Sequence, residues 1–308
     1  MNMRVGTVVL NFNNYEATLD CVRGAAEQSG TVGTEVLEHF IVIVDNGSGN
    51  DSCARLTNTL QIDSGDSCKY ENATVKLIRS GDNLGFAGGM NLGIQFLRDL
   101  EIKFIFLANS DLVFTDEHTY ECMLNRYVAY CSKDTSSLPV AIINPTIRNR
   151  NGKTECCASF KKKHLELRML KTYVPILDKM KKAVLAVNKS ADNIRTVSEI
   201  KEKEVDRGAY TVCGSGYMLT DKFFEHYKGL YPETFLYGEE YALILYLNRA
   251  GLYSMQVRTP FILHAHQAST PSGASMSREF KRKIKKHGHH IIIKLMFMSE
   301  AAIVKKYG

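Results

Sequence analysis

The chain has 308 residues, of which 44% are hydrophobic and 23% are charged, so it can form one large α/β domain or two small ones. Its net charge of +6 is unevenly spread: residues 161–189 and 278–308 each carry nine Lys or Arg against two acids, which leaves −8 for the rest. A nucleic-acid-binding protein is expected to carry its basic face on the fold itself. The distribution therefore argues against binding to nucleic acid and for binding to an anionic surface through these two segments.

The eight cysteines show no C-x-x-C spacing, and the N-terminal residues lead into a strand without a signal-peptide pattern. We therefore expect free thiols and a cytoplasmic protein. The adjacent pair Cys156 and Cys157 is interpreted as structural rather than redox-active, because no electropositive motif frames it.

The first 80 residues alternate between strand and helix patterns. We expect strands at 5–11, 41–45 and 75–78, a helix at 17–28, and a short helix after the turn at 46–49. Strands joined by helical crossovers pair in parallel, with right-handed connections. The pattern therefore predicts an α/β fold with a mostly parallel sheet.

A glycine-dense stretch, residues 82–91, follows the third strand and opens a helix that runs to about Arg98. Gly85, Gly88 and Gly89 allow backbone N–H groups to approach a phosphate at a helix N-terminus. The spacing is neither that of a P-loop nor that of the dinucleotide G-x-G-x-x-G. A plain tight turn is the alternative interpretation.

The apolar run 104–108 predicts a buried strand, and it ends abruptly in Asn109, Ser110 and Asp111. In open α/β sheets the ligand crevice lies outside the carboxyl ends of the strands, so Asp111 and Asn109 are placed where a ligand or metal is met. The alternative is an aspartate that only caps the following turn.

The middle of the chain links two predicted halves. We expect a helix at 117–131 and a strand at 140–145. Residues 158–205 form a helical insertion of different composition. Residues 161–188 within it alternate basic and apolar side chains at helical intervals, although Pro175 must break or kink any helix there. This insertion is either a solvated helical hairpin or a lid or membrane-facing flap over the acceptor site.

Two acids, Glu239 and Glu240, open an apolar helix that runs to about Asn248. The helix dipole stabilises acids in the first turn, so capping is the simplest explanation for them. We also consider a chemical role for the pair.

The last strand, at about 254–263, ends at His264, with His266 two residues on. Two histidines at a strand end facing Asp111 suit a divalent cation, and polar surface is the alternative. The apolar run 291–298 falls far short of the ~20 residues that span a bilayer, so it can lie in a membrane surface but cannot cross it.

Several motifs follow one another along the chain. The first group is V-V-L-N-F-N-N, I-V-D-N-G-S, N-L-G-F-A-G-G-M-N and F-L-A-N-S-D, and the downstream group is G-S-G-Y-M-L, F-L-Y-G-E-E and I-L-H. Over residues 4–157 and 205–270 the chain resembles the family 2 glycosyltransferases of the GT-A fold, most closely the bacterial rhamnosyl- and galactofuranosyltransferase-like members. The resemblance implies a Rossmann-like, mixed but mostly parallel sheet flanked by helices. We divide the chain into a nucleotide-sugar half at 1–112, an acceptor half at 113–270 and a basic amphipathic tail at 271–308.

The resemblance also implies a role for each matching position. The base is expected at Glu240, where the family usually has the Asp of Gly-Glu-Asp, with Glu239 as the second candidate. Asp111 and His264 would hold Mg²⁺ or Mn²⁺. The nucleotide-sugar residues would be Asn11, Asn13, Asp45, Asn46, Asn83, Gly85, Phe86, Gly88, Gly89, Asn91 and Asn109, and the acceptor residues Gly214, Ser215 and Tyr237.

The resulting hypothesis is an inverting, metal-dependent glycosyltransferase that acts on a glycan or lipid-linked acceptor in cell-surface polysaccharide synthesis, peripherally on the inner face of the membrane. A degenerate protein that binds a nucleotide sugar without turnover is the main alternative. A nucleotidyltransferase would need a glycine-rich loop with Arg and Lys near the N-terminus, which residues 9–20 lack. For the tail, a solvated helix or a contact between subunits is the alternative to a membrane surface.

Overall fold

The computed structural model describes residues 2–133, 138–155, 158–161, 205, 207, 209–265 and 278–307. The strands are β1 (Asn2–Asn11), β2 (Thr31–Val32), β3 (Glu35–Asn46), β4 (Ser67–Tyr70), β5 (Ala73–Ser80), β6 (Phe104–Asn109), β7 (Leu112–Phe114), β8 (Val140–Asn149), β9 (Ala158–Lys161), β10 (Ala209–Val212), β11 (Gly216–Leu219) and β12 (Tyr253–His264). The helices are α1 (Tyr15–Ala26), α2 (Ser52–Thr59), α3 (Gly85–Asp99), α4 (Thr119–Ser132), α7 (Asp221–Phe224), α8 (Glu239–Ala250), α9 (Arg278–Met296) and α10 (Glu300–Tyr307).

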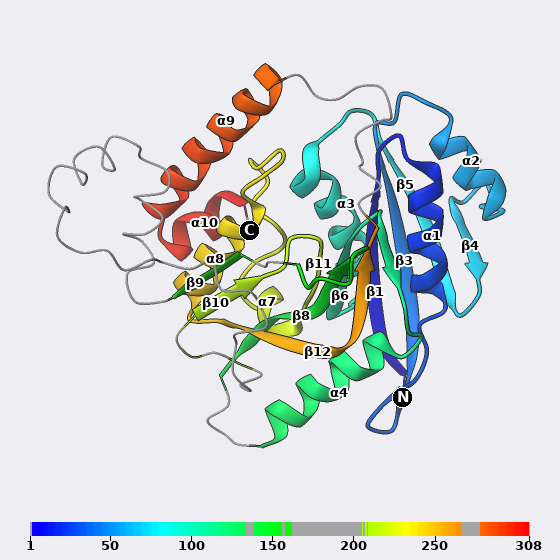
Figure 1. The fold of residues 1–308 in the computed structure, drawn as a ribbon, viewed down its shortest axis with the longest axis horizontal. Coiled ribbons are helices and arrows are strands. Elements are labelled where there is room, and N and C mark those ends of the chain that lie inside the picture. The colour runs from blue at the N-terminus through cyan, green and yellow to red at the C-terminus, as the bar shows by residue number, and fades with distance from the viewer. Residues whose placement is uncertain are drawn as a thin grey trace, which may run out of the picture.

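One ten-stranded mixed sheet organises the molecule, in the order β4–β5–β3–β1–β6–β11–β8–β12–β7 with β2 beside β3. The strands β5, β3, β1 and β6 are parallel, as the helical crossovers predict. Their register pairs Asn11 with Asp45 and Leu10 with Asn109, so the polar strand ends share one edge of the sheet. Figure 1 shows α1 and α3 on opposite faces of these strands.

The central strands are apolar on both faces because helices cover both. Val8, Val42 and Val44 belong to the core that includes α3, whereas the adjacent residues Val9 and Ile43 belong to the core that includes α1. Successive strand residues point to opposite faces, so a strand buried on both sides must be a continuous apolar run. This is the physical reason why the sequence identified these strands.

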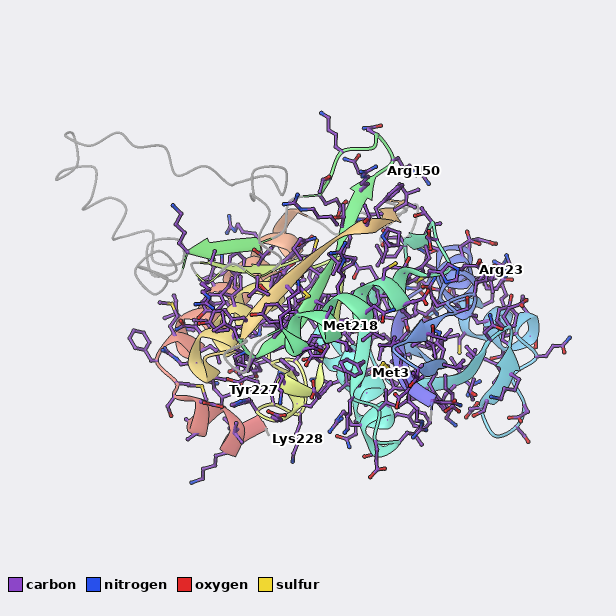
Figure 2. The ribbon with its side chains drawn as sticks, turned by 90° about the horizontal axis from the view of Figure 1, so that it is seen from below. Met3, Arg23, Arg150, Met218, Tyr227 and Lys228 are labelled. Carbon is purple, nitrogen blue, oxygen red and sulfur yellow. The ribbon has the colours of Figure 1, made fainter. Side chains whose placement is uncertain are left out.

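The C-terminal half continues the same sheet. Strand β11 pairs antiparallel with both β6 and β8, and β12 pairs parallel with β8 and antiparallel with β7. Figure 2 shows Met218 of β11 between Arg23 on one side of the molecule and Tyr227 on the other. The division into two halves stays a prediction, since a single sheet runs through both.

The predicted helical insertion at 158–205 is wrong at its start, because residues 158–161 form strand β9, which pairs antiparallel with β10. Residues 162–204 lie outside the described part of the chain. The six described cysteines carry free thiols, as expected, and Cys156 and Cys157 also lie outside the described part.

The C-terminal tail forms two helices whose apolar side is covered by protein. Ile291, Ile292 and Leu295 of α9 are at most 3% exposed and belong to the same core as α8. The expectation that the run 291–298 lies in a membrane surface is therefore wrong for these side chains, because α8 and its neighbours already bury them. Within the described residues, no helix has the length and hydropathy to cross a membrane.

The glycines of α3 let this helix lie directly on β1. The helix begins at Gly85, so most of the predicted glycine loop belongs to its first turns. A Cβ added at Gly89 would collide with Leu10, and one added at Gly93 would collide with Val8. Val8 is β-branched and fully buried, so at Gly93 the helix would have to move away.

We expect Gly93→Ala to lower the free energy of unfolding by about 1–3 kcal/mol, because the added methyl group overpacks the contact with the buried Val8. The gain in helix propensity, about 1 kcal/mol, offsets only part of this. Gly49→Ala is the control, since nothing lies within 4 Å of its added Cβ. Urea unfolding of both variants measures the difference, and equal stabilities would contradict the close-packing argument.

Candidate active site

At the end of β1, Asn11 is fully buried and holds neighbouring polar groups in place. Its Nδ2 donates to Asp45 Oδ1 at 2.6 Å and to Ser52 Oγ at 3.1 Å, and its Oδ1 accepts from Thr18 Oγ1 at 2.9 Å. The side chain therefore orients the carboxylate of Asp45 at the carboxyl ends of β1 and β3. A direct contact of Asn11 with a ligand stays a prediction.

The turns after β1 and β3 are clamped to each other. The backbone N–H of Asn13 donates to Ser48 Oγ at 2.9 Å, and Asn13 Oδ1 accepts from the N–H of Gly49 at 2.8 Å. Asn13 itself adopts a left-handed backbone with φ of 57°. The two turns thus form one rigid wall beside Asp45.

A second polar network joins β3 to the start of α3. Asn46 Nδ2 donates to Asn83 Oδ1 and to the carbonyl of Gly85, each at 3.1 Å, and Asn46 Oδ1 accepts from the N–H of Leu84 at 3.0 Å. Asn83 Oδ1 also accepts from the N–H of Gly85 at 2.9 Å. These asparagines therefore fix the conformation of the turn.

The N-terminus of α3 differs from the predicted phosphate site. The N–H of Phe86 donates to the carbonyl of Phe235 at 2.7 Å, and the N–H groups of Leu84 and Gly85 already have side-chain acceptors. A Cβ at Gly85 would collide with Phe235. The expectation that glycine frees amides for a phosphate is therefore wrong at these three positions. Glycine is needed there because two segments approach closely.

Asn91 lies further along α3 and is not brought to the strand ends. Its Nδ2 donates to the carbonyl of Leu230 at 2.9 Å, and its Oδ1 accepts from the N–H of the same residue at 2.8 Å. Both polar atoms of the side chain thus tether the segment that precedes α8. Gly88 and Gly89 lie between the two networks, within α3.

Asp111 and His264 meet, as the sequence predicts for a cation site. His264 Nε2 lies 3.0 Å from Asp111 Oδ1, and His264 Nδ1 lies 2.7 Å from Glu155 Oε1. Ser215 Oγ donates to Glu155 Oε2 at 2.9 Å. Burial lowers the pKa of His264, but the hydrogen bonds to the two carboxylates outweigh it and raise that pKa to about 9.

Glu155 is a site residue that the sequence analysis missed. It follows the turn at Asn151 and Gly152, and its N–H donates to the carbonyl of Ile147 at 2.8 Å, so the chain after β8 folds back toward the strand end. The only local signal is an Asn-Gly turn after a strand, which indicates a hairpin but not which residue reaches His264.

The donor set suits Mg²⁺ or Mn²⁺ that is shared with a substrate. Asp111 offers a carboxylate oxygen, and His264 offers Nε2 once a bound cation has displaced its proton. The described residues contain no group of three or more His, Cys, Asp or Glu side chains able to hold a metal. Magnesium is commonly bound by one or two carboxylates with the remaining positions taken by water and substrate phosphates. The residues present therefore fit such an ion.

The two acids at the start of α8 occupy different positions. Glu239 is 8% exposed, and its Oε1 has no hydrogen-bond partner within the described structure. Burial, followed by the charge of Glu240, raises the pKa of Glu239 to about 7. Burial also raises the pKa of Glu240, whose carboxylate lies against Gly214: a Cβ added there would overlap its Oε1.

The short loop between β10 and β11 joins the acid to the cation site. Gly214 contacts Glu240, and the next residue, Ser215, contacts both Glu155 and His264 through its side chain. The carbonyl of Ser215 also accepts from the N–H of Asn109 at 3.0 Å, at the end of β6. The loop thus holds the predicted base and the predicted metal ligands in one place.

Tyr237 lies at the outer side of this centre. Its backbone is left-handed with φ of 68°, and its side chain is 43% exposed. Its carbonyl oxygen lies beside Gly288 of α9. Tyr237 is therefore accessible from solvent, and its acceptor role stays a prediction.

The mixed, mostly parallel sheet flanked by helices is the fold of the GT-A glycosyltransferases. The chain belongs to glycosyl transferase family 2, whose family model matches residues 7–178. A search of curated proteins gave no match.

Solved structures show the same fold. S. aureus TarS 1–349, in complex with UDP and in a second structure described without it, aligns with a TM-score of 0.50 and 11% identity over 98% of this chain and 68% of that one. A longer TarS structure aligns at 10% identity, again with a TM-score of 0.50, and the chain covers 41% of it.

We expect the His264 pairing to stabilise the protein below pH 6.5, the ordinary pKa of histidine, and to lose that stabilisation as the pH rises through about 9. The sign follows because a raised pKa means that the folded protein holds the proton more tightly. Urea unfolding in EDTA should show a smaller stability difference between wild type and His264→Gln near pH 10 than near pH 6. A difference that stays constant with pH would contradict the pairing.

Proposed function

We propose that this glycosyltransferase is inverting and metal-dependent, and that it moves a sugar from a nucleotide-sugar donor to a hydroxyl of a glycan or lipid-linked acceptor. The observation that carries the proposal is the β10–β11 loop, because Gly214 contacts Glu240 while Ser215 contacts His264. The UDP bound to TarS supports a nucleoside diphosphate as the donor's leaving group. A rhamnosyl donor is the more specific proposal, and it rests on the sequence motifs.

In this proposal Asp111 and His264 hold Mg²⁺ or Mn²⁺, which when bound neutralises the charge that grows on the diphosphate leaving group. Glu155 accepts from His264 Nδ1 and so directs Nε2 toward Asp111. Such an outer carboxylate fixes both the tautomer and the ring orientation of a metal-binding histidine. Ser215 supports this carboxylate in turn through its hydroxyl.

Glu240 is the proposed general base. It would take the proton from the acceptor hydroxyl as that oxygen attacks the anomeric carbon from the face opposite the diphosphate, which inverts the centre in one displacement. Burial raises its pKa, and a more basic carboxylate accepts the proton more readily. Glu239 is more deeply buried and is the second candidate.

The basic C-terminal helices support a peripheral site of action in cell-surface polysaccharide synthesis, on an anionic membrane surface. Because the apolar side of α9 is buried in the protein, the attraction would be electrostatic, with Arg282, Lys283 and Lys286 all exposed on the outer side. Each Lys or Arg near such a surface contributes roughly 1 kcal/mol.

A second candidate function is a degenerate protein that binds a nucleotide sugar without turnover. The observation in its favour is that Asn109-Ser110-Asp111 offers only one carboxylate to a cation. Release of nucleotide from a panel of UDP, dTDP and GDP sugars, with and without Mn²⁺, separates the two candidates.

We expect Asp111→Asn to abolish the Mn²⁺-dependent part of UDP binding while leaving the fold intact, because the amide replaces the one charged oxygen ligand of the strand end. Isothermal titration with and without Mn²⁺ measures this, and circular dichroism checks the fold. Asp116→Asn, an exposed aspartate elsewhere on the surface, is the control. If Asp111→Asn binds UDP and Mn²⁺ like wild type, the cation site is wrongly placed.

We expect Glu240→Gln to keep donor affinity and to lose transfer by about 10²–10⁴, the usual contribution of a general base. The assay is product formation with the donor that the panel identifies, and Glu239→Gln is measured beside it. Loss in Glu239→Gln alone would exchange the two roles. Full activity in both variants would refute a base at the start of α8.

A further inference from the structure

A groove with a volume of about 460 Å³ lies along the outer side of α9. Its polar lining consists of Lys283, Lys286, His287, His290, Lys294 and Glu233. The groove is therefore basic: with both histidines neutral, three lysines face one glutamate.

The single acid in the groove is already matched by lysines. Lys294 Nζ lies 2.8 Å from Glu233 Oε2, and Lys306 Nζ of α10 lies 3.1 Å from Glu233 Oε1. Glu233 therefore holds two cationic side chains in position at one end of the groove. Of the other two lysines, Lys283 Nζ lies 3.3 Å from Glu279 Oε1, whereas Lys286 has no carboxylate partner in the described part of the chain.

Three donors of the lining have no protein partner. The side chains of Lys286, His287 and His290 form no hydrogen bond or ion pair with another group in the described ranges. They stand on a helix whose opposite side is buried, with Ile292 and Leu295 both at 0% exposure. The helix is thus fixed to the protein, and the donors are presented from a rigid support.

The groove adjoins the acceptor side of the proposed active site. His287 is next to Gly288, where an added Cβ would lie 2.8 Å from the carbonyl oxygen of Tyr237. Two residues after Tyr237, Glu239 opens α8. Figure 1 shows the yellow chain that leads into α8 between α9 and α3, and the Phe86 N–H to Phe235 carbonyl bond fixes it to α3.

The lining is chemically suited to phosphate. It contains Lys and His but no Arg, whereas planar carboxylates are matched best by the two-pronged guanidinium of Arg. A phosphate group carries about −1.5 to −2 charges at pH 7 and three acceptor oxygens. Three unpartnered donors and an excess of lysine therefore complement it in both charge and number.

We propose that this groove binds a phosphate group of the acceptor, so that the acceptor of the transfer is a phosphate-bearing molecule. That the bound molecule is the acceptor rests on the proposed function, whereas the phosphate site itself rests on the groove alone. The phosphate belongs either to a lipid diphosphate or to a soluble phosphorylated chain, and the experiment distinguishes the two sources.

The test uses the full chain in EDTA, so that the cation site does not contribute, and titrates it with inorganic pyrophosphate and with geranyl diphosphate. We expect Lys286→Gln to weaken binding about tenfold, the effect of losing one hydrogen bond to a charged group. Arg282→Gln is the matched control, because it removes one charge from the same exposed helix outside the groove lining. It should change affinity less than about twofold. If only geranyl diphosphate binds, the phosphate belongs to a lipid diphosphate. If both probes bind equally, it belongs to a soluble phosphorylated chain.

UDP binding with Mn²⁺ is measured on the same samples. Pyrophosphate binding that depends on Lys286 and persists with the UDP site saturated supports the groove, even if no sugar transfer is ever found. Equal losses in Lys286→Gln and Arg282→Gln, or no binding of either probe, overturn it while leaving the proposed transferase in place. Binding only to phosphatidylglycerol vesicles, reduced equally in both variants, also overturns it and makes the face a membrane surface.

Discussion

The structure depends on how one buried aspartate is paired at the end of a strand. Asp111 is 7% exposed, and an isolated carboxylate at such a position would lose far more hydration than it gains. His264 lies between the carboxylates of Asp111 and Glu155 and contacts both. These contacts raise the pKa of His264. The β10–β11 loop, the chain after β8 and the end of β12 must all meet for this to occur. The site is therefore a consequence of the sheet order as much as of the residues.

The glycines of α3 show how the same residue type can serve packing where a ligand role was expected. Three amides at the start of the helix have acceptors within the protein, and Gly89 and Gly93 bring the helix onto β1. The close approach brings the segment before α8 against α3 through Phe235. Glycine here allows close contact between α3, β1 and the segment before α8.

The C-terminal helices combine two functions on two sides. Ile292 and Leu295 complete the core around α8, so the tail is part of the folded domain rather than an appendage. The opposite side of α9 carries Lys286, His287 and His290, whose side chains have no partner in the described part of the chain. An amphipathic pattern of this kind predicts a helix with one buried side, but it does not say whether protein or lipid buries it.

The sequence by itself determined the strands and their polar ends, because runs such as 41–44 and 104–108 are buried on both faces and must be apolar throughout. Since parallel strands share one carboxyl edge, the nearness of Asp45 to Asn11 also follows. Only the tertiary structure decided that Glu155 reaches His264, 109 positions away, and that Ser215 bridges them. These contacts depend on the return of the chain after β8 and on the register of β11 and β12, and no local sequence pattern encodes distances between such remote segments.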